Sequence, residues 1–445
     1  MNISFDIFSK SNQLRKRAHS IIPGGCHTYA KGDDQYPVLS PGFIERGLGC
    51  RVWDVDGNEF IEYGMGNRAV GLGHAYEPVL AAVRETLKTG SNFTRPARIE
   101  VECAETFLES VPGTEMVKFC SDGSDATSGA LKLARAHTGR DMIARCADHP
   151  FFSTDDWFIG TTAMDGGIPE AVKALTLQFP YGDLDAAAGL FARYPGQIAA
   201  FILEPARTED PPEGYLQALL QLCHDNGALL IFDETITGFR WHANGAQRLY
   251  GVVPDLSIFG KAMSNGFSVS ALAGKREFMR LGGLGHTDKP RVFLLSTTHG
   301  AETHSLAAAI ATMRTYQSEP VVEHLARQGK RLREGVNQAI DRHGLGAYVQ
   351  VIGRDCCLFY GARDPEGNPS QAFRSLLLQE TIRRGVLMPS LVVSYAHGDA
   401  DIDRTIEAFD GALAVYAKAI SDGVERYLVG RPSEVVFRKF NSAHE

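Results

Sequence analysis

The sequence predicts an α/β protein with a mostly parallel sheet at its centre. From about residue 100, five short apolar runs without polar alternation are separated by segments of helical character: 117–120, 142–144, 198–203, 229–232 and 256–259. Such runs are typical of parallel strands that helices cover on both faces. Two of them lead into ionisable side chains. Asp233 directly follows the fourth run, and Lys261 follows the fifth run by two residues.

The composition fits a soluble globular protein. The chain has 445 residues, of which 44% are hydrophobic and 22% charged, and its net charge is -8. It is long enough to bury a sizeable core, and without a basic block nucleic acid is not the expected partner. No apolar run approaches the roughly 18 residues of a membrane span, and residues 1–17 lack the apolar core of a secretion signal. We therefore expect a cytoplasmic protein with no membrane partner.

Eight cysteines are spread along the chain, at positions 26, 50, 103, 120, 146, 223, 356 and 357. None of them forms a CxxC pair, and several lie in apolar surroundings, where free thiols are usually buried. We expect reduced cysteines, as in a cytoplasm, and neither zinc nor another bound metal.

Before the sheet, the sequence predicts a helix, a hairpin and a second helix. The first helix covers residues 10–22 and ends at a Pro-Gly-Gly sequence. The turn 56–58 joins residues 51–53 to residues 59–61 as an antiparallel hairpin. The second helix covers about 76–87, after a glycine-rich stretch.

After about residue 318 the pattern changes to that of an α+β domain. A long helix is predicted over 321–342, strands over 347–361, a helix over 371–384, and a last helix with an apolar face from Ile402 to Ile420. The tail after 425 has no assignable pattern. The predicted parts are an N-terminal segment of a small domain, a large domain and a C-terminal α+β domain: 1–75, 76–317 and 318–445.

An acid and an amine at neighbouring strand ends suit a site for pyridoxal 5'-phosphate (PLP). In parallel sheets, ligands bind at the carboxyl ends of the strands, where Asp233 and Lys261 emerge. The amine would form a Schiff base, and the acid would keep the pyridine nitrogen protonated. Burial and a cationic neighbour are expected to lower the pKa of Lys261, which must lose its proton to react. The plainer alternatives are a helix cap or ion pair for Asp233 and a solvated Lys261.

Two turns are candidate phosphate contacts. Residues 121–126 follow a strand and open a helix, so free backbone N–H groups and the positive end of the helix dipole favour an anion there. The alternative is an ordinary N-cap by Ser124 or Asp122. Residues 296–300 precede a helix that begins near His304. They too are either a phosphate contact or an ordinary capped helix start.

Further candidates lie after two other strands. The carboxylate of Glu204 either organises the region around the hydroxyl group of the cofactor ring or pairs with nearby Arg207. Phe151 and Phe152 either stack on a flat ring or belong to the core. The sequence lacks the signatures of phosphate-binding loops, zinc proteases, serine-hydrolase elbows and dinucleotide-binding folds. A nucleotide-binding module is therefore disfavoured.

Taken together, these segments resemble the class III PLP-dependent aminotransferases, and within them the branch that contains glutamate-1-semialdehyde 2,1-aminomutase. The similarity covers roughly residues 15–420. The motifs that carry it are Gly123-Ser124-Asp125-Ala126, Glu204-Pro205, Asp233-Glu234, Thr237-Gly238-Phe239-Arg240 and Phe259-Gly260-Lys261. The resemblance implies a type I aminotransferase fold, in which a large domain with a mostly parallel, seven-stranded sheet is joined to a smaller α+β domain.

The resemblance also implies roles for residues of this chain. Lys261 would hold PLP and carry the proton between carbon atoms, and Asp233 would contact the pyridine nitrogen. Thr298 would reach the phosphate of the partner subunit's cofactor, so that a homodimer is needed for a complete site. The other implied cofactor contacts are Gly123 and Ser124 at the phosphate, Thr235 and Phe152 against the ring, and Glu204.

Several positions depart from the family pattern. An aromatic-His-Gly motif appears here as residues 148–152, which leaves either phenylalanine of this segment to stack on the ring. Lys31 stands where the aminomutase has a carboxylate-binding arginine, and Asn67, followed by Arg68, stands where it has a tryptophan. Lys31, Arg68 and Arg207 are candidate contacts for an anionic substrate, although each also suits a structural or surface role.

The segment 153–168 looks shorter than the lid with which the aminomutase retains a diamine intermediate. The leading hypothesis is therefore an aminotransferase that passes an amino group from a donor to a carbonyl acceptor by a ping-pong mechanism. The alternative is a 2,1-aminomutase that moves the amino group within one molecule. A non-catalytic PLP-fold protein is a third hypothesis, and the presence of both Lys261 and Asp233 argues against it.

Overall fold

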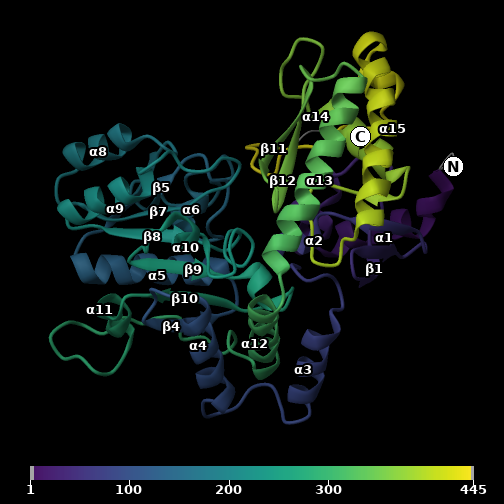
Figure 1. Cartoon of the computed structure of the whole chain (residues 1–445). Helices are drawn as coiled ribbons and strands as arrows, with labels where there is room; N and C mark the ends of the chain where they lie inside the picture. The colour runs from purple at the N-terminus through teal and green to yellow at the C-terminus, as the bar shows by residue number, and fades with distance from the viewer. Residues whose placement is uncertain (1–4, 442–445) are drawn as a thin grey trace. The chain divides into compact units, whose positions relative to one another are not determined.

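The computed structural model describes residues 5–441, which form two compact units (Figure 1). One unit combines the chain up to Tyr76 with Glu323–Val436, and the other combines Glu77–Val322 with the chain from Phe437 onward. The sequence-based limits at 75/76 and 317/318 lie close to these divisions. The assignment of three domains stays a prediction.

The sheet of the second unit has seven strands in the order β4-β10-β9-β8-β7-β5-β6. Only β10 runs antiparallel to its neighbours, so the mostly parallel sheet is confirmed. The sequence did not predict β6 and β10, because one is short and partly polar and the other consists mainly of small residues. The strands are β4 (Met116–Cys120), β5 (Met142–Cys146), β6 (Thr176–Phe179), β7 (Ile198–Leu203), β8 (Leu229–Asp233), β9 (Leu256–Phe259) and β10 (Ser270–Gly274).

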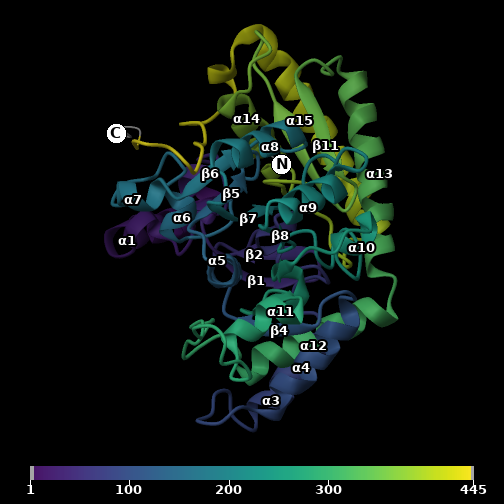
Figure 2. The ribbon, with the colours of Figure 1, turned by 90° about the vertical axis from the view of Figure 1, so that its left-hand side faces the viewer.

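Helices lie on both sides of this sheet, as Figures 1 and 2 show. All residues of β7 and β8 are buried, which explains their continuous apolar runs. The helices are α3 (Glu77–Leu87), α4 (Arg98–Ser110), α5 (Gly123–Thr138), α6 (Asp156–Ile159), α7 (Glu170–Lys173), α8 (Leu184–Arg193), α9 (Tyr215–Asp225), α10 (Ala246–Tyr250), α11 (Arg276–Met279) and α12 (Thr303–Ser318).

The first unit is built on two small sheets. The predicted hairpin is confirmed, with Arg51 opposite Ile61 and Trp53 opposite Glu59. The strands are β1 (Ile44–Leu48), β2 (Arg51–Asp54), β3 (Glu59–Glu62) and β13 (Val386–Leu387) in one sheet, and β11 (Val349–Arg354) and β12 (Cys357–Ala362) in the other. The helices are α1 (Ser9–Ile21), α2 (Met65–Arg68), α14 (Gln371–Ile382), α15 (Asp399–Asp422) and all but the first two residues of α13 (Val321–Arg342).

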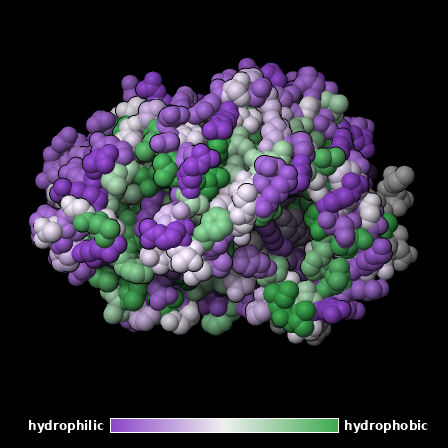
Figure 3. Space-filling model, turned by 90° about the horizontal axis from the view of Figure 1, so that it is seen from below, coloured by the Kyte–Doolittle hydropathy of each residue, from purple (hydrophilic) through white to green (hydrophobic). Residues whose placement is uncertain are grey.

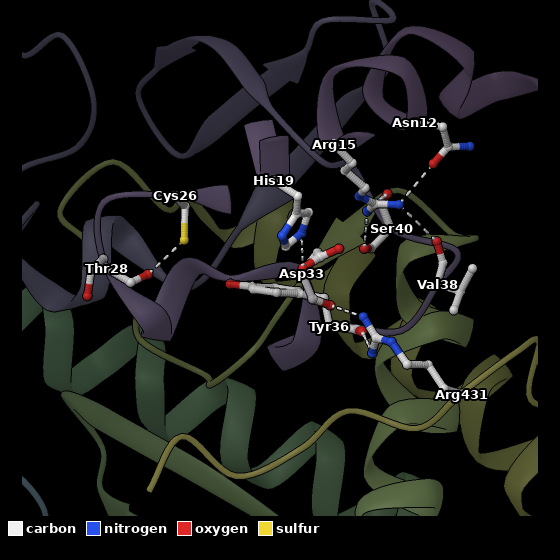
Figure 4. Close-up of polar contacts among 10 residues, drawn as sticks. All are labelled: Asn12, Arg15, His19, Cys26, Thr28, Asp33, Tyr36, Val38, Ser40 and Arg431. Carbon is white, nitrogen blue, oxygen red and sulfur yellow. Dashed lines mark hydrogen bonds and ion pairs between the residues drawn. The ribbon is translucent and has the colours of Figure 1, made fainter. Parts of the chain in front are cut away.

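The C-terminal tail, which the sequence left unassigned, holds the N-terminal segment of its own unit. The Arg431 guanidinium donates to the Asp33 carbonyl at 2.8 Å, and the Glu434 amide donates to the Asp34 carbonyl at 2.8 Å. From the other side, Arg15 on α1 donates to the Ser40 carbonyl at 2.8 Å (Figure 4). The segment between these contacts is therefore tied at both ends.

The surface seen in Figure 3 mixes hydrophilic residues with small, separate hydrophobic patches. Within residues 5–441, no helix has both the length and the apolar character needed to cross a bilayer.

Candidate active site

The carboxyl ends of β7, β8 and β9 bring the predicted site residues to one edge of the sheet. These strands are neighbours and run parallel. Asp233 is the last residue of β8 and pairs in register with Ile258 of β9. Lys261 follows Ile258 by three residues, and adjacent strands are about 4.8 Å apart. The acid and the lysine therefore emerge at the same edge of the sheet, and the positive charge of Lys261 acts on Asp233.

Thr235 lies between the segments that carry the amine and the predicted phosphate contact. A Cβ added at Gly123 would lie 3.3 Å from the Thr235 hydroxyl oxygen, and one added at Gly260 would lie 3.4 Å from its methyl group. Three chain segments that are distant in sequence therefore meet within van der Waals distance. Their convergence gives a site with an amine, a carboxylate and a helix N-terminus.

Asp233 is a buried carboxylic acid with an unusual charge balance. Burial and the neighbouring Glu204 carboxylate raise its pKa to about 6. The Thr235 amide, which donates to Asp233 Oδ1 at 2.9 Å, and the positive charge of Lys261 act in the opposite direction. Asp233 and Lys261 are thus electrostatically coupled. A cationic ring placed beside Asp233 would complete the neutralisation of its carboxylate.

Glu234 has a structural role, although it is adjacent to Asp233 in the sequence. Its carboxylate accepts hydrogen bonds from the Thr237 hydroxyl at 2.8 Å, the Ala246 amide at 2.6 Å and the Gln247 amide at 2.7 Å. Burial nevertheless raises its pKa to about 7. These three donors fix the turn after β8 to the start of α10. Only the first of the two acids is therefore left for a ligand.

The backbone at Lys261 is held in a conformation that its residue type rarely adopts. Lys261 has a φ of 47°, in the left-handed region that favours glycine. It follows Gly260, whose added Cβ would lie only 2.5 Å from the Ser270 hydroxyl oxygen. Strained non-glycine residues cluster at functional sites, where the surrounding structure fixes a side chain in one direction.

At the start of α5, Asp122 is the N-cap residue, which is one of the two alternatives for this turn. Its Oδ1 accepts hydrogen bonds from the Ser124 amide at 2.8 Å and the Asp125 amide at 3.1 Å. The Ser124 hydroxyl oxygen accepts from the Thr154 amide at 3.1 Å and keeps its own proton to donate. The Gly123 N–H has no hydrogen-bond partner among residues 5–441. Phosphate binding by Gly123 and Ser124 stays a prediction.

Glu204 is ion-paired with Arg207, at 2.8 Å between Oε1 and Nη1. The Glu204 amide donates to His149 Nδ1 at 3.0 Å, and burial lowers the pKa of this histidine. Within the described chain, Glu204 Oε2 is buried without a hydrogen-bond partner. A polar group of a ligand near Asp233 would satisfy it. The ion pair weakens the case for Arg207 as a substrate contact, because a buried carboxylate already holds it.

The two candidate stacking residues differ in exposure. Phe152 is 2% exposed and packs edge-on against Phe158, with ring centroids 5.8 Å apart. Phe151 is 46% exposed. Phe152 is thus part of the core, and its stacking on a cofactor stays a prediction.

Thr298 lies on an exposed loop that abuts the start of α5. Its carbonyl accepts a hydrogen bond from the Asn92 amide group at 3.0 Å. Gly300, with a φ of 133°, approaches so closely that an added Cβ would lie 2.9 Å from the Ser121 amide nitrogen. The loop also lines a cavity of about 690 Å³ with residues 91–97. The contact of Thr298 with a partner subunit stays a prediction.

Lys31 and Arg68 belong to the first unit. Lys31 is exposed at the end of a short 3-10 helix, Tyr29–Lys31. Arg68 stacks its guanidinium 4.7 Å from the centre of the Phe359 ring. It ends α2, a turn in which Met65 and Asn67 are left-handed as well. Each such non-glycine residue costs about 1–2 kcal/mol.

A neighbouring carboxylate supports this left-handed turn. Glu62 accepts a hydrogen bond from the Met65 amide at 2.6 Å and pairs with His74 at 3.0 Å. The turn is therefore fixed although its residues disfavour the conformation.

Comparison with known protein families shows which family the chain belongs to. The model of the class III aminotransferases matches residues 29–389. The chain belongs to this family. Glutamate-1-semialdehyde 2,1-aminomutases of Desulforamulus reducens and Geotalea daltonii are each 33% identical to this class III enzyme. The first alignment covers 92% of this chain and 99% of the relative, and the second covers 90% and 98%.

Solved structures agree with the fold. The FumI protein of Sphingopyxis sp. MTA144, solved with PLP, superposes with a TM-score of 0.84 at 29% identity, over 93% of this chain and 98% of the other. An omega-transaminase from Sphaerobacter thermophilus superposes with a TM-score of 0.82 at 27% identity, over 92% and 98%. This class III enzyme therefore has the α/β fold of type I PLP enzymes and uses PLP, as the sequence predicted.

The residues present fit this cofactor. Asp233 is buried and lacks full charge neutralisation, which a protonated pyridine nitrogen would supply. The Gly123 N–H and the Ser124 hydroxyl proton suit a phosphate, and Lys261 supplies the amine. When bound, PLP withdraws electrons from the carbon that bears the substrate's amino group.

His149 is a residue of the site region that sequence reasoning did not single out. It is 2% exposed and orders the backbone at Glu204. Its position in the altered aromatic-His-Gly motif was the available signal.

Proposed function

We propose that this class III enzyme is a 2,1-aminomutase, which moves an amino group between adjacent carbon atoms of one small molecule. The observation that carries the proposal is the 33% identity to curated glutamate-1-semialdehyde 2,1-aminomutases over nearly their whole length. The comparisons support this reaction better than the transamination that the sequence favoured. The structure supports it further, because the charge of Lys261 acts on the buried Asp233.

In this proposal each residue of the strand-end site has a separate task. The Lys261 amine binds the cofactor and afterwards moves a proton between the two substrate carbons that exchange the amino group. Asp233 keeps the pyridine nitrogen protonated, and Thr235 packs against the ring. Gly123 and Ser124 donate hydrogen bonds to the phosphate.

The proposal also includes a homodimer. Thr298 would extend from one subunit to the cofactor phosphate of the other, for which its exposure on a loop is suitable. Lys31 and Arg68 are proposed to bind an anionic group of the substrate. We place the enzyme in the cytoplasm and keep the three-part domain assignment as part of the proposal.

An aminotransferase is the second candidate, and specific observations favour it. By the resemblance to the aminomutase branch, Lys31 and Asn67 stand where that pattern has an arginine and a tryptophan. The segment 153–168 looks short for a lid that retains an intermediate. The omega-transaminase from Sphaerobacter thermophilus is also a structural relative at 27% identity.

The need for a second carbonyl compound distinguishes the two reactions. We expect the PLP- or pyridoxamine-phosphate-loaded enzyme to complete many turnovers with glutamate 1-semialdehyde as the sole substrate. An aminotransferase would stop after about one conversion per active site until a carbonyl acceptor is added, because each half-reaction changes the form of the cofactor. Product per active site, measured by mass spectrometry with Lys261→Ala as the blank, separates these outcomes. A strict requirement for the added acceptor would refute the aminomutase.

A further inference from the structure

Asp122 occupies a backbone donor of the turn at which the cofactor phosphate is proposed to bind. Its Oδ1 accepts the N–H groups of Ser124 and Asp125, the second and third residues of α5. One backbone N–H makes one strong hydrogen bond, because its strength falls steeply as the angle at the hydrogen narrows. A phosphate that also binds the Ser124 N–H must therefore share this donor with Asp122 or take it over.

Charge makes the sharing unfavourable. The Asp122 side chain carries a carboxylate to the same helix end that attracts the phosphate. Asp125 lies three residues after Asp122, and burial together with the Asp122 charge raises the pKa of Asp125. A third acid, Asp155, accepts a hydrogen bond from Ser128 on the same helix. The helix end therefore holds acidic groups of its own before any phosphate arrives.

We propose that the Asp122 carboxylate competes with the cofactor phosphate for the Ser124 N–H and thereby weakens the binding of PLP. This inference rests on the proposed placement of the phosphate at Gly123 and Ser124. In the absence of cofactor, Asp122 keeps the helix end capped. When PLP binds, its phosphate displaces Asp122 from the Ser124 N–H and leaves it on the Asp125 N–H.

A plain helix cap is the alternative, and Asp122→Asn separates the two. Asparagine caps helices about as well as aspartate, so the substitution keeps the helix end intact. Its neutral amide oxygen accepts the Ser124 N–H more weakly than a carboxylate does, so a phosphate displaces it more easily. Asp125→Asn removes a charge from the same turn without touching the contested N–H. Asp183→Asn alters a cap at the start of α8, where the side chain accepts the Ala186 N–H at 2.8 Å.

The experiment titrates the cofactor-free full chain with PLP and, separately, with pyridoxal, which lacks the phosphate. The change in absorbance on binding gives both dissociation constants. We expect Asp122→Asn to lower the dissociation constant of PLP about tenfold, because the contested N–H is held more weakly by an amide oxygen and a like-charge contact near solvent is relieved. The constant for pyridoxal should stay within about twofold. Asp183→Asn should change neither constant.

Three results would overturn the inference. The first is a dissociation constant of PLP that Asp122→Asn leaves unchanged or raises. The second is an equal improvement by Asp125→Asn, which would show general charge relief instead of competition for the N–H. The third is an equal improvement for pyridoxal. If the unaltered chain binds neither compound, the proposed function falls as well, whereas normal binding with no response to Asp122→Asn defeats the inference alone.

Discussion

Replacement of Lys261 by alanine lowers turnover by about 10⁴-fold or more. The amine both binds the cofactor and moves the substrate proton, and loss of a group with two such tasks removes most of the chemical catalysis. Alanine retains neither function. Turnover is measured with excess PLP in the assay, so that weaker cofactor retention does not produce the loss by itself.

Lys275→Ala is the matched control for this variant. Lys275 also follows a strand of the sheet, β10, but it pairs with the fully buried Asp255 at 2.5 Å. Its loss leaves a buried carboxylate with fewer partners, so we expect lower stability with turnover retained in the folded fraction. Multiple turnover by Lys261→Ala at a rate near that of the unaltered enzyme would refute the catalytic role.

Replacement of Asp233 by asparagine has two opposite effects. Turnover falls by about 10³-fold, because the amide cannot keep the pyridine nitrogen protonated. The cofactor-free protein becomes more stable at pH 7.5. The folded-state pKa of Asp233 is about 6 against an ordinary value of 3.8, so the folded state binds more protons between these two pH values. Its stability therefore falls as the pH rises from about 4 to 6, by up to roughly 3 kcal/mol, and stays lower above that range.

Urea unfolding of the cofactor-free protein at a series of pH values measures this effect. Asp233→Asn should flatten the decrease in the free energy of unfolding between pH 4 and pH 6. The pKa of Glu234 is raised to about 7, so the ionisation of Glu234 also destabilises the folded protein as the pH rises. Part of the decrease in the free energy of unfolding should therefore remain in the variant. If Asp233→Asn leaves the pH dependence of the free energy of unfolding unchanged, the pKa of Asp233 is not raised in the folded protein.

The strand ends were predictable because several independent signals agree there. The apolar runs gave five strands of the sheet, and parallel topology then placed Asp233 and Lys261 at one edge. The long helix Val321–Arg342 was also predicted with its limits, because its apolar positions repeat with helical spacing. In these segments, the local sequence pattern and the tertiary contacts favour the same secondary structure.

Other features depend on contacts that a local pattern does not contain. β10 has mostly small residues and becomes a strand only because β4 and β9 lie on either side of it. The left-handed turn Met65–Arg68 has non-glycine residues at three of its positions, and its conformation depends on support from Glu62. The C-terminal tail is ordered by hydrogen bonds to residues almost 400 positions earlier.

The substrate contacts were the least predictable part of the site. In the sequence, only the positive charge of Lys31, Arg68 and Arg207 marks them as candidate contacts for an anionic substrate. The structure gives Arg207 a buried partner, Glu204, and stacks Arg68 on Phe359, whereas Lys31 is exposed. Charge at a position does not reveal whether another part of the chain already neutralises it.

Identification of the lysine that carries the cofactor tests the central claim most directly. The enzyme is loaded with PLP and treated with borohydride, which fixes the cofactor covalently to the amine that has bound it. Proteolysis and mass spectrometry then locate the modified residue. The account predicts the cofactor mass on Lys261, and no such label there when Lys261 is replaced by alanine. A label on another lysine of the unaltered enzyme, with Lys261 unmodified, would contradict the account.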